Sequence, residues 1–383
     1  MRRINSIDFT RGLVMIIMAL DHTRDLLHIG TNPTDLAVTT PLLFFTRWIT
    51  HLCAPTFVFL SGVSAYLSAT NSDDIKESQK FLLSRGLWLI ILEFTVVGFG
   101  LWFDIKFRMF FFQVIAAIGF GFIILALLMR LNAKIILIIG LVIVFTHNLL
   151  ALLPFNEPPY LYFAPLFSFA ILPIGDITTF AVGYPPIPWL GIMLIGYGFG
   201  GTVFGRSPRN RKSQLFRLGI ISIVLFVVLR YFNVYGDPVP WQMNRDLVMA
   251  IMSFLNVTKY PPSLLYTLVT LGICFIILSA SANKRGWFMK FVSVYGKVPL
   301  FYYVIHWYLI HIIMFVMLFF QGFELKDLVF GPFQFGRPKL PSGLEIWYIY
   351  PIWIGVVLVL YPLCKWYSNY KADHRDNKWL RYL

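Results

Sequence analysis

The stretch SIDFTRGLVMIIMALDHTRDLLH, residues 6–28, decides how this chain is organised. Gly12 to Leu20 is an unbroken apolar run of the kind that enters a bilayer as a helix. Polar residues follow before the helix has crossed, because residue 21 lies only about 14 Å beyond Gly12 at roughly 1.5 Å per residue. A hydrocarbon core is about 30 Å thick, so these polar groups are expected near its middle.

Four of the five residues from 21 to 25 are ionisable, namely Asp21, His22, Arg24 and Asp25. Ionisable groups at that depth are costly and usually mark a functional site that faces protein or water. A spacing of three places Asp21 beside Arg24, and His22 beside Asp25. A carboxylate beside an imidazole raises its basicity, so the pattern predicts that His22 is a general base. The alternative is that the helix ends early and the cluster lies in an aqueous loop.

The composition is that of a membrane protein. Hydrophobic residues make up 58% of the 383 residues and charged residues 13%, whereas soluble domains carry about 25% charged residues. The formal net charge of +14 does not indicate nucleic-acid binding here, because the basic residues fall in short loops between apolar stretches. Cys53, Cys274 and Cys364 have neither pair nor metal spacing and are expected to be core residues.

Hydrophobic periodicity predicts one all-α polytopic membrane domain over residues 1–383, with about ten transmembrane helices. The expected spans are residues 9–29, 51–70, 86–104, 109–129, 134–153, 184–205, 218–235, 262–281, 297–321 and 345–364. The long connections 154–183, 236–261 and 322–344 are expected to roof a site at one membrane face, the second of them with a short amphipathic helix.

The loop charges predict the orientation. One set of connections and both chain ends are rich in basic residues, namely Arg2, Arg3, Lys76, Lys80, Arg85, Arg130, Lys134, Arg206, Arg209, Arg211, Lys212, Arg217, Lys284, Arg285, Lys290, Lys371, Arg375, Lys378 and Arg381. The other set carries fewer basic residues. Because cytoplasmic loops carry the excess of lysine and arginine, the N- and C-termini are both expected to be cytoplasmic.

Two further clusters lie near the predicted outer face. Arg47 and His51 are four residues apart and share a helix face at the start of the second span. His51 is either a site residue or an ordinary interfacial residue beside Trp48. Lys259 precedes Tyr260 and a double proline, and is a candidate for holding an anionic substrate group.

The ninth span offers three polar aromatic residues. Tyr302 and His306 are four residues apart, so they could present a hydroxyl and an imidazole together, or be hydrogen-bonded core. His306 and His311 are five residues apart and do not share a face. No shared metal ion is therefore expected.

The sequence contains no zinc-protease, Walker A, GxGxxG or GxSxG motif. This argues against metallopeptidase, ATPase, dehydrogenase and α/β-hydrolase functions. Histidine with carboxylates and arginines in a membrane cavity suits acyl transfer, where the imidazole deprotonates an acceptor and cations hold an anionic donor. The same groups also suit a proton-coupled transporter of an acyl or glycan-related metabolite.

Sequence motifs favour acyl transfer over proton-coupled transport. Arg3, Ser6, Asp8, Arg11 and Gly12 form the pattern RxxSxDxxRG before an apolar helix. This pattern resembles the heparan-alpha-glucosaminide N-acetyltransferase catalytic-domain family, in its bacterial branch. Four further segments resemble that family in the same order, namely FFTRWITHLCAPTFVFLSG (44–62), YPPIPWLGIMLIGYGFG (184–200), FLNVTKYPPSLLYTL (254–268) and YGKVPLFYYVIHWYLIHI (295–312).

The resemblance implies an acyltransferase of the bacterial plasma (inner) membrane. It would pass an acetyl group from cytoplasmic acetyl-CoA to an amine or hydroxyl of a sugar or glycan on the far side, without a metal. The catalytic histidine of the lysosomal relative would fall near Pro41, where this chain has none. The base is therefore assigned to His22, with His51 as the alternative. A homo-oligomer, the acceptor and N- versus O-transfer stay open.

The expected site has two groups of residues. The catalytic group is His22, oriented by Asp25 or, if the local helix is distorted, by Asp21, with His51 in reserve. The second group holds substrate or donor. It consists of Arg24, Arg47 and Lys259 as anion-binding residues, with Tyr302 and His306 closing the site.

Overall fold

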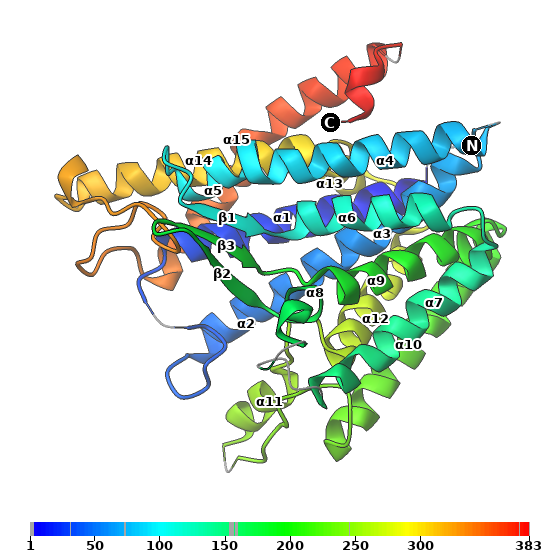
Figure 1. The fold of residues 1–383 in the computed structure, drawn as a ribbon, viewed down its shortest axis with the longest axis horizontal. Coiled ribbons are helices and arrows are strands. Elements are labelled where there is room, and N and C mark those ends of the chain that lie inside the picture. The colour runs from blue at the N-terminus through cyan, green and yellow to red at the C-terminus, as the bar shows by residue number, and fades with distance from the viewer. Residues whose placement is uncertain are drawn as a thin grey trace.

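The computed structural model describes residues 4–30, 32–72, 74–152, 157, 160–244, 246–374 and 376–382. Arg2, Arg3 and Arg375 lie outside the described residues, as do the side chains of Lys378 and Arg381. The predicted all-α polytopic architecture is confirmed: long helices run side by side, and one small sheet lies at one end of the bundle (Figure 1).

The helices follow one another along the whole chain. They are α1 (Asn5–Leu27), α2 (Pro41–Ile49), α3 (Cys53–Ala69), α4 (Ile75–Leu92), α5 (Gly98–Trp102), α6 (Val114–Leu128), α7 (Ala133–Thr146), α8 (Ala164–Phe167), α9 (Pro186–Phe199), α10 (Pro208–Phe232), α11 (Leu247–Leu255), α12 (Leu264–Ser281), α13 (Trp287–Lys297), α14 (Pro299–Phe320) and α15 (Ile346–Asp373). The strands are β1 (Met109–Phe112), β2 (Ala170–Ile174) and β3 (Thr178–Val182).

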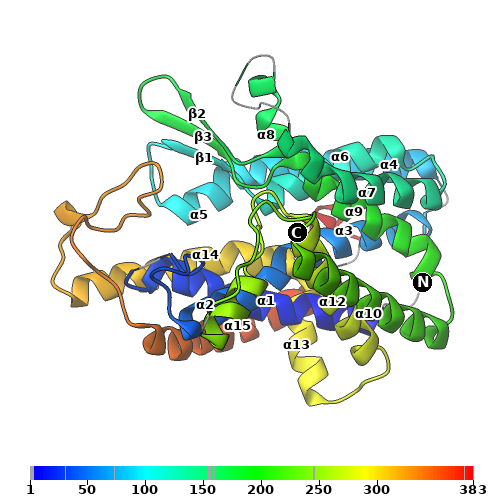
Figure 2. The ribbon, with the colours of Figure 1, turned by 90° about the horizontal axis from the view of Figure 1, so that it is seen from below.

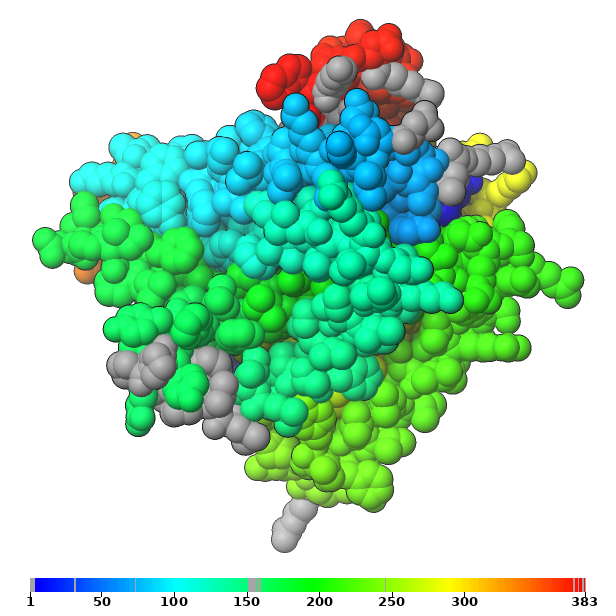
Figure 3. Space-filling model, turned by 45° about the vertical axis from the view of Figure 1, so that its right-hand side comes forward, coloured from blue at the N-terminus to red at the C-terminus, as the bar shows by residue number. Residues whose placement is uncertain are grey.

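Eight helical segments of the described chain are long and apolar enough to cross a membrane. They correspond to eight of the ten expected spans. The other two expected spans correspond to α1, which carries the charged cluster, and to α6, an apolar helix of 15 residues. Large apolar side chains on the outer faces of α4, α6 and α7 are exposed, namely Leu87, Ile91, Leu127, Ile138 and Val142, as lipid contact requires. Figure 3 shows these helices forming one continuous face.

Two boundaries differ from the expectation. The span expected at 109–129 begins with β1, and the connection 154–183 contributes the hairpin of β2 and β3. The strand order is β1-β3-β2, with β1 parallel and β2 antiparallel to β3. Pairing with β3 satisfies the backbone groups of Met109 to Phe112, which hydropathy alone assigned to a helix. The amphipathic helix expected in 236–261 is confirmed as α11.

The two ends of the bundle differ. The N-terminus and the connections after α3, α6, α9 and α12 lie at one end, on the right of Figure 1. We call this the basic end, because Lys76, Arg130, Arg206, Lys284 and Arg285 are found there. The opposite end carries the sheet, α11 and the connection that precedes α15 (Figure 1).

Helix α1 lies at the centre of the bundle and packs against α3, α12, α13, α14 and α15 (Figure 2). Its contact with α13 is unusually close. A side chain added at Gly12 would collide with the backbone of Val292, and one at Gly296 would collide with the backbone of Asp8. Glycine at both positions lets the two backbones touch, so no passage remains between these helices at this level.

Candidate active site

A pair of histidines lies where α1 meets α14. Nδ1 of His22 is 2.6 Å from Nε2 of His306. The ring of His22 also stacks on Trp307, with ring centroids 3.9 Å apart, and meets the edge of Tyr303. His306 is fully buried, whereas His22 is only half-buried. The two side chains therefore form one unit with its accessible side at His22.

Hydrogen bonding fixes the tautomers of this pair. Nδ1 of His306 faces the backbone carbonyl oxygens of Tyr302 and Tyr303. A carbonyl oxygen can only accept, so Nδ1 of neutral His306 carries the proton and its Nε2 accepts from Nδ1–H of His22. The basic lone pair of His22 is then on Nε2, which no hydrogen bond engages within the described part of the chain. This is how a second group orients a general base.

The partner of His22 differs from the one expected. Nη2 of Arg24 lies 2.7 Å from Oδ1 of Asp25 and 2.7 Å from Oδ1 of Asp21. The i,i+3 spacing places His22 and Asp25 on one helix face. Asp25 nevertheless pairs with Arg24, because a hydrogen bond between a guanidinium and a carboxylate is stronger than one to a neutral imidazole. Neither carboxylate makes a hydrogen bond to His22 in the described chain, so neither orients it here.

Asp21 joins the second cluster to the first. Its Oδ2 is 3.5 Å from Nη1 of Arg47, which also donates to Oγ1 of Thr50 at 2.8 Å. Asp21 and Arg24 are both nearly inaccessible to solvent. Two carboxylates and two guanidiniums thus form a compensated network beside the histidine pair, as ions at membrane depth require.

A cavity of about 460 Å³ opens next to this network at the opposite end. Its walls include Arg24, Asp25, Arg47, His51 and Lys259, so five of the predicted site residues meet in one place. Nε of Arg24 and Nδ1 of His51 are buried there without a hydrogen-bond partner in the described chain. Unpaired buried nitrogens are rare, and they indicate a place where a ligand or water completes the hydrogen bonds.

Lys259 has an aromatic surrounding in that cavity. Its Nζ lies 4.9 Å from the ring centroid of Tyr260 and 5.9 Å from that of Tyr184. The two rings hold the ammonium group in place without neutralising it. Together with Arg24 and Arg47 it outnumbers the two carboxylates of the network, so the cavity is net cationic.

A second, narrower hollow of about 90 Å³ approaches the histidine pair from the basic end. Tyr303, whose ring meets that of His22 edge-on, is one of its lining residues, and Arg11 and Arg85 line it among apolar residues of α3, α4, α6 and α14. Nη2 of Arg11 donates to Oγ of Ser64 at 2.8 Å. Neighbours of the histidine pair therefore line two separate hollows, Tyr303 this one and Arg24 the cavity at the opposite end.

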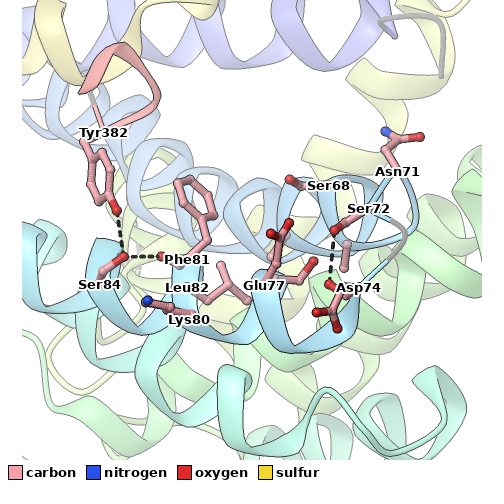
Figure 4. A pocket seen from close by; sticks show the side chains of 13 residues that line it. Ser68, Asn71, Ser72, Asp74, Glu77, Lys80, Phe81, Leu82, Ser84 and Tyr382 are labelled. Carbon is pink, nitrogen blue, oxygen red and sulfur yellow. Dashed lines mark hydrogen bonds between the residues drawn. The ribbon is translucent and has the colours of Figure 1, made fainter. Parts of the chain in front are cut away.

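A wide basin lies at the basic end of the same α3–α4 crevice. It has a volume of about 910 Å³ and is drawn in Figure 4, where Ser68, Glu77 and Phe81 point toward its interior. Successive residues of α4 line first the basin and then the narrow hollow, since Phe81 and Leu82 belong to one and Arg85 and Leu89 to the other. Basin and hollow thus follow one crevice inward.

Tyr302 lies differently from the expectation. Its ring stacks on His306 with centroids 5.6 Å apart, but its buried hydroxyl has no hydrogen-bond partner among the described residues, and Tyr302 lines neither hollow. The spacing of four residues does bring the rings of Tyr302 and His306 together. The hydroxyl of Tyr302, however, does not accompany Nε2 of His306, which faces His22. Tyr303 and Trp307, which sequence reasoning missed, contact His22 from α14 in addition to His306.

Two further residues shape the site from a distance. Arg230 is fully buried and donates to the carbonyl oxygens of four residues between 239 and 256, which fixes one wall of the cavity. The carboxylate of Glu93 accepts from the backbone nitrogens of Ile115 and Ala116, both at 2.9 Å, and so caps the start of α6. The sequence shows that Glu93 lies in an apolar stretch, but it does not show which groups the carboxylate binds.

Comparison with known protein families identifies the family of this chain. Residues 3–235 match the family described as heparan-alpha-glucosaminide N-acetyltransferase, catalytic. The matched region contains the cluster of residues 21–25, Arg47 and His51, but it ends before Lys259 and His306. No curated protein matches the chain.

Proposed function

The chain belongs to the heparan-alpha-glucosaminide N-acetyltransferase catalytic family, and from that premise we propose which reaction it performs. It moves an acetyl group from cytoplasmic acetyl-CoA to an amino or hydroxyl group of a sugar or glycan on the other side of a bacterial plasma membrane. The observation that carries this proposal is the His22–His306 pair, 2.6 Å apart, whose neighbour Tyr303 lines the narrow hollow and whose neighbour Arg24 lines the cavity at the opposite end.

The base in this proposal is Nε2 of His22. It takes the proton from the acceptor as the acceptor nitrogen or oxygen attacks the thioester carbonyl carbon. The tetrahedral intermediate collapses, the carbon–sulfur bond breaks, and the CoA thiolate takes the proton back from His22. Nε2 of His306 stabilises the transient imidazolium, because it accepts the hydrogen bond from Nδ1. A general base of this kind contributes about 10²- to 10⁴-fold.

The donor comes through the α3–α4 crevice. The positive-inside rule makes the basic end cytoplasmic, and the basin of about 910 Å³ opens there. The hollow beyond it is narrow and mostly apolar, which suits the pantetheine arm of coenzyme A. Lys80 lines the basin beside Asp74 and Glu77 and would meet the phosphates. Arg11 and Arg85 line the hollow, where they would meet the polar groups of the arm.

The acceptor comes from the opposite end. The cavity of about 460 Å³ has room for one sugar unit, and the described residues leave buried nitrogens of Arg24 and His51 without a hydrogen-bond partner there. Lys259 between two tyrosine rings suits an acidic sugar, and Tyr260 offers a flat surface for the sugar ring. Asp21 keeps Arg24 and Arg47 in place for this purpose.

The test uses purified protein in proteoliposomes with acetyl-CoA on one side and glucosamine on the other. We expect CoA release that depends on acetyl-CoA and acetylated sugar in the opposite compartment. Uptake of the sugar or of the acyl donor without turnover would instead support the proton-coupled carrier. Absence of any acetyl-CoA binding would leave the family membership describing the fold alone.

A further inference from the structure

A third hollow at the basic end is strongly cationic and lies apart from the donor route. Its volume is about 710 Å³, and its walls come from α1, α13, α15 and the turn before α13. Its charged lining residues are Lys284, Arg285, Lys290, Lys297, Lys365 and Asp8. Among the described residues, five cationic side chains and one carboxylate line this hollow, so it carries a net positive charge.

Helical spacing aims these side chains at a common point. Lys290, Ser293 and Lys297 recur every three or four residues on α13, and on α15 Ser368 and Asn369 lie three and four residues after Lys365. The neutral members add hydroxyl and amide donors to the ammonium groups. No ion pair engages any of the five cations within the described ranges of the chain, so their charge is available to a ligand.

This basic hollow does not lead to the histidine pair. Its lining residues include Asp8 on α1 and Lys297 on α13, next to the point where Gly12 and Gly296 bring the two backbones into contact. The contact closes the way inward, because no side chain and hence no ligand chain fits between the helices there. The narrow hollow of the donor route is lined by residues of α1, α3, α4, α6 and α14, and it shares no lining residue with the basic hollow.

The surroundings of the basic hollow fit a lipid. Trp287 and Phe288, at the start of α13, are 77% and 51% exposed beside it. Tryptophan at a helix end is typical of the membrane–water boundary, and cytoplasmic leaflets carry anionic head groups. Lysine is a common partner of phosphate oxygens. We propose that this hollow binds the phosphodiester head group of an anionic phospholipid, a site separate from acetyl transfer.

The experiment measures lipid binding to the full chain in a neutral detergent. Dioleoyl phosphatidylglycerol is titrated against the unfolding temperature and against bound lipid in native mass spectrometry, with dioleoyl phosphatidylcholine as the neutral lipid. A ligand that binds only the folded state raises the unfolding temperature. We expect this rise with phosphatidylglycerol only, and at least a tenfold weaker affinity in Lys290→Gln/Lys365→Gln. Higher salt should weaken binding as well.

A matched control removes two exposed cations elsewhere at the basic end, in Arg209→Gln/Lys212→Gln, and should bind phosphatidylglycerol as the unmodified chain does. Equal loss in both double variants, or no loss in either, would overturn the proposal. Acetyl-CoA is the second probe. If it displaces phosphatidylglycerol, and Lys290→Gln/Lys365→Gln binds it at least tenfold more weakly, the hollow belongs to the donor instead. Lipid binding is measured without acetyl transfer, so it can be established even if the protein does not transfer acetyl groups.

Discussion

His306 and His311 lie on the same helix, five residues apart, and both are fully buried, yet their surroundings differ. Nε2 of His306 faces the ring of His22, which is itself accessible from one side. Nε2 of His311 donates to the backbone carbonyl of Phe335 at 2.8 Å, and its ring stacks on Phe103. The hydrogen bond of His306 therefore leads to a titratable side chain, whereas that of His311 leads to the backbone carbonyl of a loop.

The difference teaches what makes a buried histidine functional. Burial, residue type and helix are the same for both, so none of these decides. The deciding feature is whether the hydrogen bond leads to a group that can exchange a proton with a ligand. His306 passes that test through His22, whereas His311 holds the connection before α15 against α14.

The largest effect is expected from the accessible end of the functional pair. His22→Ala should lower acetyl transfer by about 10²- to 10⁴-fold, because the general base is lost. The measurement is CoA release from acetyl-CoA with a saturating amino-sugar acceptor. His28→Ala, just beyond α1, is the control for folding and insertion and should keep full turnover.

His51→Ala tests the same assignment from the other side. The imidazole of His51 lines the outer cavity, so its loss should alter acceptor affinity more than turnover. If His22→Ala keeps normal turnover while His51→Ala has none, His51 and not His22 is the general base.

The next effect concerns the orienting partner. His306→Ala should lower turnover by roughly 10- to 100-fold, since a hydrogen bond to a charged ring is worth about 1.5–3 kcal/mol. His306→Gln keeps an acceptor near the position of Nε2 and should recover much of that loss. The measurement is turnover against pH in both variants. Equal loss in both would mean that packing, and not the hydrogen bond to His22, is what His306 provides.

A smaller effect is expected in the outer cavity. Lys259→Met should raise the Michaelis constant of an acidic acceptor about tenfold with little change in turnover, because one charged contact of roughly 1.4 kcal/mol is lost. Lys259→Arg retains the charge over the two tyrosine rings and serves as the matched control. An unchanged Michaelis constant in Lys259→Met would remove this residue from the site.

The smallest effect on activity is expected at the second histidine of the comparison. His311→Ala should leave turnover within about threefold of normal while it lowers the free energy of unfolding by on the order of 2 kcal/mol, through a cavity and an unpaired carbonyl. Turnover and thermal unfolding are measured on the same preparation. A loss of turnover comparable to that of His306→Ala would break the distinction between the two histidines.

Local signals in the sequence predicted much of this architecture. Apolar runs placed all ten expected spans on helices, and amphipathic spacing placed α11. The cluster from Asp21 to Asp25 was readable because ions in an apolar run are costly wherever the chain goes. The strand β1 was not readable, because Met109 to Phe112 is as apolar as a span and its partner β3 lies some 70 residues away.

The chain by itself thus determined the class of protein, the candidate depth of the ionic cluster and the family. Only the tertiary structure paired His22 with His306, 284 residues apart, paired Asp25 with Arg24, and placed Arg11 and Lys259 in two separate hollows. Hydropathy and helical period are set by neighbours along the chain. Which side chains meet across the bundle depends on the rotation and closeness of packed helices, as the Gly12–Gly296 contact fixes for α1 and α13.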